Sequence, residues 1–238
     1  MRQKYDISIY GKRFVSFAAV AIITLLKKEF FLELRRKSVM AGLGLYLFSM
    51  VFISYLAFSL RQNLITPLVW SALFWIVVLF TAINTVAKSF IGEKRGLEIY
   101  YYSIASPVDV LFSKIIYNFF LCLVLSFAGY FLFTLFLNDP IQDKSIFIVA
   151  LTLVSLGFAA SLTLLSGIAS KANNSNILMT VLSFPVVISI LLMAIKVTKN
   201  CIDGLDPDVS YNSLLLLAAI NGLVTALSYL LFPLIWKN

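Results

Sequence analysis

Six long apolar runs without a charged residue limit what this chain can fold into. Each run is about 20 residues long, which is the length a helix needs to cross a hydrocarbon layer about 30 Å thick. Hydrophobic residues make up 61% of the sequence and charged residues 13%, whereas soluble domains are about 45–50% apolar and about 25% charged. The strands of a membrane barrel would alternate in polarity, so the sequence predicts an all-α polytopic membrane protein. The predicted spans are residues 39–60, 67–87, 115–137, 146–169, 177–195 and 213–234.

The distribution of Lys and Arg predicts that both termini are cytoplasmic, because basic residues that flank spans are retained on that side. Fifteen of the 19 basic residues fall on one predicted side, and the acidic residues 139, 143, 203, 206 and 208 fall on the other. The net charge of +8 therefore indicates topology. Nucleic-acid binding would need a soluble basic face with stacking aromatics, so we expect the lipid bilayer as a partner and no nucleic acid.

Residues 1–38 predict a cytoplasmic segment that precedes the six-helix membrane domain, residues 39–238. Its apolar stretch is too short to span and lacks a small-x-small cleavage site, which argues against a signal peptide. At 100° per residue, residues 23, 26, 30, 31 and 34 form an apolar face opposite a charged one, as in an amphipathic helix at the membrane interface. That helix is either a membrane anchor or an elbow that also touches a cytoplasmic partner. Its candidate residues are Glu29, Phe30, Glu33, Arg35 and Arg36.

Missing residues exclude several functions. The sequence has no histidine, the commonest metal ligand and general base, and no G-x-x-x-x-G-K-[ST] phosphate loop. Cys122, in a span, and Cys201, expected in an outer loop, are not spaced as a metal site. The predicted spans hold no ionisable residue that could bind a coupling ion. We therefore predict no catalytic residue, no metal site and no firmly bound cofactor, and expect a partner to supply the energy for any transport.

The connection over residues 88–114 is charged, cytoplasmic and longer than a tight hairpin. Gly96 can break the preceding helix and Pro107 can start the next one, so Leu97 to Ala105 can form a short helix along the membrane. One interpretation is a plain interfacial loop. The other is a coupling helix that presses into a groove of an ATPase subunit.

The same connection carries a family resemblance. Glu93, Gly96-Leu97-Glu98, Ser106-Pro107 and the downstream Lys114 resemble the cytoplasmic loop of ABC-2-type permeases. Within that group the chain resembles the haem exporter protein B family, CcmB. The resemblance extends to the entry segment from Lys28 to Arg36, to the Pro67-Leu68-Val69-Trp70 start of the second span, and to Ser155 through Pro185 in the fourth and fifth spans.

This resemblance implies a multi-pass permease subunit of the bacterial cytoplasmic (inner) membrane, acting in c-type cytochrome biogenesis. It implies partners similar to CcmA, which binds ATP, and to the haem-handling CcmC and CcmD, and a second copy of this chain. Haem is the implied transported or released ligand. The sequence leaves two other functions open, an ABC-2 exporter of a lipid, glycan or drug, and a scaffold of the haem-handling complex that transports nothing.

Features inside the spans predict packing and motion. Pro185 removes one helix hydrogen bond, which makes it a candidate hinge or a static bend. Gly157 with Ser161, and Gly222 with Ala226, have the small-xxx-small spacing of close helix contacts. The strongly polar side chains in the spans are Asn84, Asn118, Asn221 and several Ser and Thr residues, and most of them are expected to form hydrogen bonds between helices.

Overall fold

The computed structural model describes residues 20–32, 35, 37–59, 65–86, 88–91, 106–171 and 175–237, and none of these residues forms a strand. Six of the described helices are long and apolar enough to cross a membrane, which confirms the all-α fold with six spans. The helices are α2 (Lys37–Ser59), α3 (Pro67–Val86), α4 (Lys88–Ile91), α6 (Pro107–Leu137), α7 (Lys144–Ser170), α8 (Ser175–Asp203) and α9 (Pro207–Lys237).

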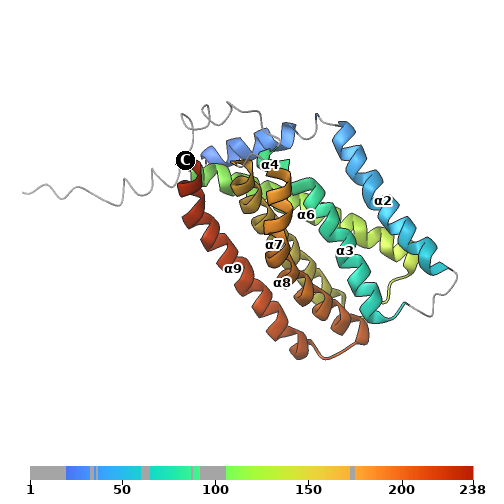
Figure 1. Ribbon diagram of the computed structural model, residues 1–238. Coiled ribbons are helices and arrows are strands. Elements are labelled where there is room, and N and C mark those ends of the chain that lie inside the picture. Colours follow the sequence, from blue (N-terminus) through green and yellow to red (C-terminus); the bar gives the residue numbers. More distant parts are fainter. Residues whose placement is uncertain are drawn as a thin grey trace, which may run out of the picture.

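The long helices form one bundle, and a shorter helix over residues 20–32, here called the N-terminal helix, lies across one end of it near α4 (Figure 1). We call this the proximal end and the opposite one the distal end. α9 finishes at the proximal end, close to the N-terminal helix (Figure 1). The described parts of both chain ends thus lie at the same end of the bundle, as an even number of spans requires.

Several helices are longer than the predicted spans, and two of the extensions bear on the predictions. α6 begins at Pro107, eight residues before the predicted third span, and α8 continues to Asp203. Cys201 therefore lies in the last turn of α8, where its side chain is only 2% exposed, and the prediction that it sits in a loop was wrong. Helix continues through these charged ends because a backbone that leaves the bilayer still gains from its internal hydrogen bonds.

α7 occupies the centre of the bundle and packs against α6, α8 and α9. From Gly157 to Gly167 every side chain of α7 is buried, and most of these residues are small. Small residues let neighbouring backbones approach closely, which is how helices associate in lipid. The sequence of α7 thus explains why it is the helix with neighbours on every side.

Aromatic side chains fill the space between α3, α6 and α7. Trp70, Phe74 and Trp75 of α3 are at most 1% exposed, and the Phe74 ring lies 5.4 Å from that of Phe133 in α6 and 5.7 Å from that of Phe147 in α7. The Trp75 indole Nε1 donates to Thr198 Oγ1 of α8 at 2.8 Å. One buried polar contact therefore sets the position of α3 against α8 within an otherwise apolar core.

Asn118 and Asn221 link helices, as predicted for most of the polar residues in the spans. Asn118 Nδ2 of α6 donates to Thr163 Oγ1 of α7 at 2.8 Å, and Asn221 Nδ2 of α9 donates to the Leu153 carbonyl of α7 at 2.8 Å. Asn84 Nδ2 donates to the Phe80 carbonyl within its own helix. Asn118 and Asn221 thus both tie a neighbouring helix to α7.

The two predicted small-residue contacts have different outcomes. A Cβ built at Gly157 would lie 2.5 Å from Asn221 Oδ1, so α7 and α9 do approach closely there. A Cβ built at Gly222 meets no atom within 4 Å, so the expected contact at Gly222 is wrong within this chain. Gly222 faces away from α7 because it follows Asn221, whose side chain points to α7, by one residue, or about 100° around the helix.

Pro185 lies inside α8, and its side chain is exposed. The helix runs unbroken from Ser175 to Asp203 across this position. Whether α8 bends there during function stays a prediction.

Candidate functional site

A buried polar cluster joins the N-terminal helix to α4, α6 and α7 at the proximal end. We call this cluster the proximal junction. Its members come from four segments that are far apart in the sequence, and they are Glu29, Ser89, Lys114, Asn118, Thr163 and Ser166.

The start of α6 is fixed by a helix cap. Ser106 Oγ accepts a hydrogen bond from the Asp109 backbone N–H at 3.2 Å and donates one to Asp109 Oδ2 at 2.7 Å. Pro107 occupies the first turn, where its missing N–H costs nothing and its fixed φ suits the helix. The cap sets where α6 begins and thus the depth at which Lys114, two turns later, enters the bundle.

Lys114 is only 2% exposed, although its sequence context predicted a flank of a cytoplasmic loop. Its Nζ lies 3.2 Å from Glu29 Oε1, donates to the Ser89 carbonyl at 2.9 Å, and sits 4.9 Å from the centre of the Phe90 ring. A buried ammonium is tolerated only when it is paired and hydrogen-bonded. Lys114 thus joins the N-terminal helix and α4 to α6.

Glu29 is the acidic partner of Lys114, and its side chain is 15% exposed. A second ammonium, Lys28 Nζ, lies 3.1 Å from the same Oε1 atom. Burial raises the pKa of the Glu29 carboxyl, but the charges and hydrogen bonds of Lys114 and Lys28 together outweigh burial, so its pKa lies below the ordinary value of 4.5. The carboxylate is therefore ionised, and the junction contains a true ion pair.

α4 has only four residues, and the junction holds it from two sides. Asn118 Nδ2 donates to Ser89 Oγ at 3.1 Å in addition to its bond to α7, and the Phe90 backbone N–H donates to Ser166 Oγ of α7 at 3.1 Å. A four-residue helix has no independent stability. These contacts with α6 and α7 therefore fix the place where the chain leaves α4.

Apolar side chains close the junction toward α9. The Phe90 and Phe232 rings lie 5.3 Å apart, and a Cβ built at Gly167 would lie 2.8 Å from Phe232. Leu25 of the N-terminal helix packs against the same small core. The low polarity around the ion pair strengthens its attraction and raises the cost of breaking it.

The structure corrects the predicted position of one residue of the N-terminal helix. The face toward the bundle carries Leu25 and Glu29, which are one turn apart. Phe30 and Phe31, predicted on the membrane face, are exposed on the outside of the bundle, where lipid can contact them. The prediction that Glu29 lies on the charged face toward solvent was wrong, because the buried ammonium of Lys114 attracts the Glu29 carboxylate toward the bundle. Arg35 is exposed.

Several predicted site residues lie outside the described residues. They are Glu93, Gly96, Leu97 and Glu98 of the connection, and Glu33 and Arg36 of the elbow segment. Of the predicted connection over residues 88–114, the structure describes both ends, and both are helical. Residues 88–91 form α4, and residues 107–114 form the first two turns of α6.

Sequence reasoning missed the parts of the junction that depend on tertiary contact. Ser89, Thr163 and Ser166 are common span residues with no distinguishing pattern. Glu29 and Lys114 were both singled out, but as parts of separate segments 85 residues apart. A usable signal was present, because Lys114 directly precedes a charge-free apolar run and needs a partner if α6 begins at Pro107.

Comparison with known families decides the identity of the chain. Residues 20–233 match the model of a family described as CcmB protein, which is nearly the whole chain. The chain belongs to the CcmB family. The family resemblance read from the connection and the spans is thereby confirmed, and with it a membrane permease of the haem-exporter type linked to c-type cytochrome biogenesis. Comparisons with curated proteins and with solved structures found no match.

The matched region of this CcmB protein begins with the first described residue of the N-terminal helix and includes every member of the proximal junction. The N-terminal helix is therefore part of the CcmB region of the chain and not an unrelated extension. CcmB is a permease family and not a catalytic one, in keeping with the lack of a phosphate loop in the sequence.

The ion pair predicts a dependence of stability on pH. The pKa of Glu29 is lowered in the folded protein. The stabilising contribution of the Glu29 carboxylate is therefore complete above the ordinary carboxyl pKa, and it is lost as the pH falls through the lowered pKa of the folded state. We therefore expect the melting temperature of the purified full chain to fall more steeply than that of the Glu29→Gln variant as the pH is lowered below about 5. Parallel melting curves for the two proteins between about pH 7 and pH 3.5 would contradict this expectation.

Proposed function

We propose that this CcmB chain is the membrane-spanning subunit of an ABC transporter complex that exports or releases haem during c-type cytochrome biogenesis. A separate subunit similar to CcmA binds and hydrolyses ATP, and its motion is passed to the connection that follows α4. Subunits similar to CcmC and CcmD handle the haem. A second copy of this chain completes the complex, since a paired ATPase needs two docking connections.

The observation that carries this proposal is the proximal junction. Both ends of the connection over residues 88–114 are anchored there, through Ser89 in α4 and Lys114 in α6. A force on the connection would therefore act on α6 directly, and through Ser166 on the central helix α7. The N-terminal helix, held by Glu29, would move with them. A loose loop could not pass on a displacement in this way.

The placement of charge supports a cytoplasmic location for the proximal end. The N-terminal helix, which is followed by the basic segment at residues 35–37, lies there, whereas Asp139, Asp143 and Asp203 lie around the distal end. Basic residues near span ends are retained in the cytoplasm, and the ATPase acts on that side. We therefore assign both termini to the cytoplasm and the protein to the bacterial inner membrane.

A haem stain of c-type cytochromes tests the proposal. Deletion of the gene is expected to abolish covalently bound haem, and the native chain is expected to restore it. We expect Glu98→Ala to restore less than a tenth of the stain, a loss equivalent to about 1.4 kcal/mol or more of coupling energy, at unchanged abundance in the membrane. The matched control is Asp208→Ala, which removes an exposed carboxylate at the distal end and should restore the stain fully.

The other outcomes each reject a stated part of the proposal. An unchanged stain after deletion would reject the role in cytochrome biogenesis and favour an exporter of another substrate. A full stain with an ATPase-dead partner subunit would favour a scaffold over a transporter. Full restoration by Glu98→Ala would reject the coupling role of that residue.

A further inference from the structure

We propose that a pocket at the distal end is a binding site for one glycerophospholipid, whose ester carbonyl accepts a hydrogen bond from the Trp70 indole. The inference does not depend on the proposed transport function or on the orientation of the protein. It rests on the position of the pocket, the chemistry of its lining and one buried donor without an acceptor.

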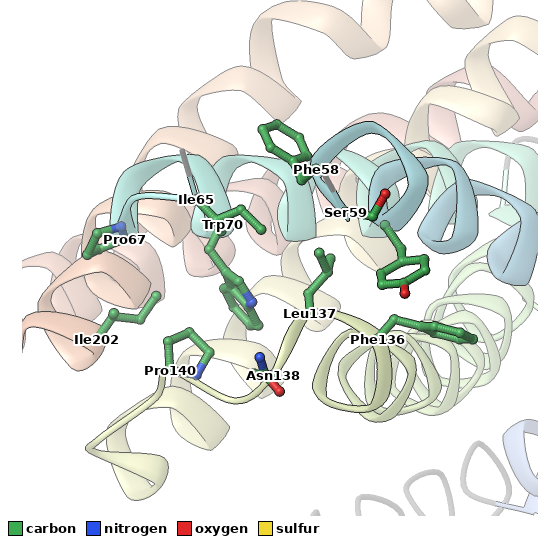
Figure 2. A pocket seen from close by; sticks show the side chains of 11 residues that line it. Phe58, Ser59, Ile65, Pro67, Trp70, Phe136, Leu137, Asn138, Pro140 and Ile202 are labelled. Carbon is green, nitrogen blue, oxygen red and sulfur yellow. The ribbon is translucent and has the colours of Figure 1, made fainter. Parts of the chain in front are cut away.

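The pocket lies where α2 ends, α3 begins and α6 ends (Figure 2). Tyr55 and Phe58 of α2 line one side, Pro67 and Trp70 of α3 another, and Phe136 of α6 a third. Its volume is about 240 Å³, below the range of about 300–1,000 Å³ typical of sites that enclose a whole small molecule. It therefore suits a segment of a longer molecule whose remainder stays outside.

The Trp70 indole is the one buried donor in this lining that lacks an acceptor. The side chain is 1% exposed, and Nε1 has no hydrogen-bond partner among the described residues. Figure 2 shows the indole nitrogen on the side of the ring toward Leu137 and Asn138, within the ring of lining side chains. A buried N–H without a partner costs about 1–3 kcal/mol. An acceptor on a bound molecule would remove this cost.

The lining specifies the chemistry of that acceptor. None of the 11 described residues that line the pocket is charged, so none of them would neutralise a phosphate or a carboxylate. A neutral carbonyl that continues into an apolar chain would accept a hydrogen bond from the indole N–H, and the chain would pack against the aromatic side chains.

The depth of Trp70 identifies a membrane lipid as the source of this carbonyl. Trp70 lies three residues after the start of α3, or about 4.5 Å along the helix axis. It therefore sits just inside the end of a span, at the level where tryptophans meet lipid headgroups. The ester groups of a phospholipid lie at this boundary, with the acyl chain directed into the bilayer and the phosphate directed to water.

Retention of defined lipids by the full-length chain tests the site. The chain is reconstituted in vesicles that contain equal amounts of a diacyl phosphatidylcholine and a diether phosphatidylcholine with the same chain lengths, and is then extracted in mild detergent for native mass spectrometry. The native chain should retain one diacyl lipid in preference to the diether lipid. Trp70→Phe, which keeps an aromatic ring but removes the N–H, should retain about five- to tenfold less diacyl lipid and show no preference.

Trp75→Phe is the matched control, because it removes an indole N–H that already has a partner, Thr198, and does not line the pocket. It should retain lipid as the native chain does. If Trp70→Phe does not fold, Ser59→Phe provides a second test, since its ring would fill the pocket and should displace the lipid. Equal retention of the two lipids by the native chain, no retention at all, or unchanged retention in the Ser59 variant would each overturn the proposal.

Discussion

Lys114→Met is expected to lower the melting temperature of the purified chain by about 10 °C, the largest effect predicted here. Methionine matches the length of lysine but removes the buried ammonium from the Ser89 carbonyl and from the Glu29 carboxylate, which keeps only the more exposed Lys28 as a cationic partner. Breaking a buried ion pair from one side costs about 3–5 kcal/mol, and in a chain of this size 1 kcal/mol corresponds to about 2–4 °C. The measurement is thermal unfolding in detergent, followed by tryptophan fluorescence.

Lys144→Met is the matched control for this prediction. Lys144 Nζ lies 3.1 Å from Asp139 Oδ2, close to the distance of the Lys114 pair, but its side chain is 66% exposed. Exposed pairs contribute about 0–1 kcal/mol, so the shift should be at most about 3 °C. The double variant Glu29→Gln, Lys114→Met should be less unstable than the sum of the single variants. Strict additivity would mean that the two residues do not act as a pair.

Gly157→Val is expected to destabilise the chain by about 3 kcal/mol. The first added carbon would lie 2.5 Å from Asn221 Oδ1 and 3.0 Å from Ile190 Cδ1. The Asn221 amide cannot swing away without breaking its bond to the Leu153 carbonyl. Forcing extra carbons into a packed interior costs about 1–3 kcal/mol, and a lost hydrogen bond adds about 1 kcal/mol. The same unfolding measurement applies.

A pair of alanine variants makes this test specific. Gly157→Ala should destabilise the chain, whereas Gly222→Ala should leave stability unchanged or raise it by up to about 1 kcal/mol, because alanine favours helix and its Cβ meets open space. Adding Asn221→Ala to Gly157→Ala should recover part of the loss. Equal effects at the two glycines would contradict the close approach of α7 and α9.

The spans and the fold class could be predicted because the bilayer imposes a strict length and polarity on each helix. Helix ends were less predictable. The start of α6 at Pro107 could be read from the sequence, yet the span was placed eight residues later because Lys114 is charged. Hydropathy assigns a lysine to water, and only the tertiary partner Glu29 makes its burial acceptable.

The same limit applies to the glycines and to the N-terminal helix. Gly157 and Gly222 have equivalent spacing patterns, but the side chain opposite each one decides whether a contact forms. The amphipathic pattern of residues 20–32 predicted the helix and its exposed apolar side chains correctly, but it placed Glu29 on the solvent face, because its partner Lys114 is 85 residues away in the sequence. The sequence pattern of one segment does not predict the energy of a contact with another segment.

The central place of α7 has a consequence for the order in which the protein is made. α7 is the fourth span along the chain, and two of its three main neighbours, α8 and α9, are synthesised after it. When α7 first enters the bilayer, α8 and α9 are not yet beside it, and the surface around Gly157 that later contacts Asn221 faces lipid. The interior of this protein is therefore completed only when its last helix has been inserted. A ribosome that stops early releases a chain with an incomplete core. Such a chain is a substrate for membrane proteases.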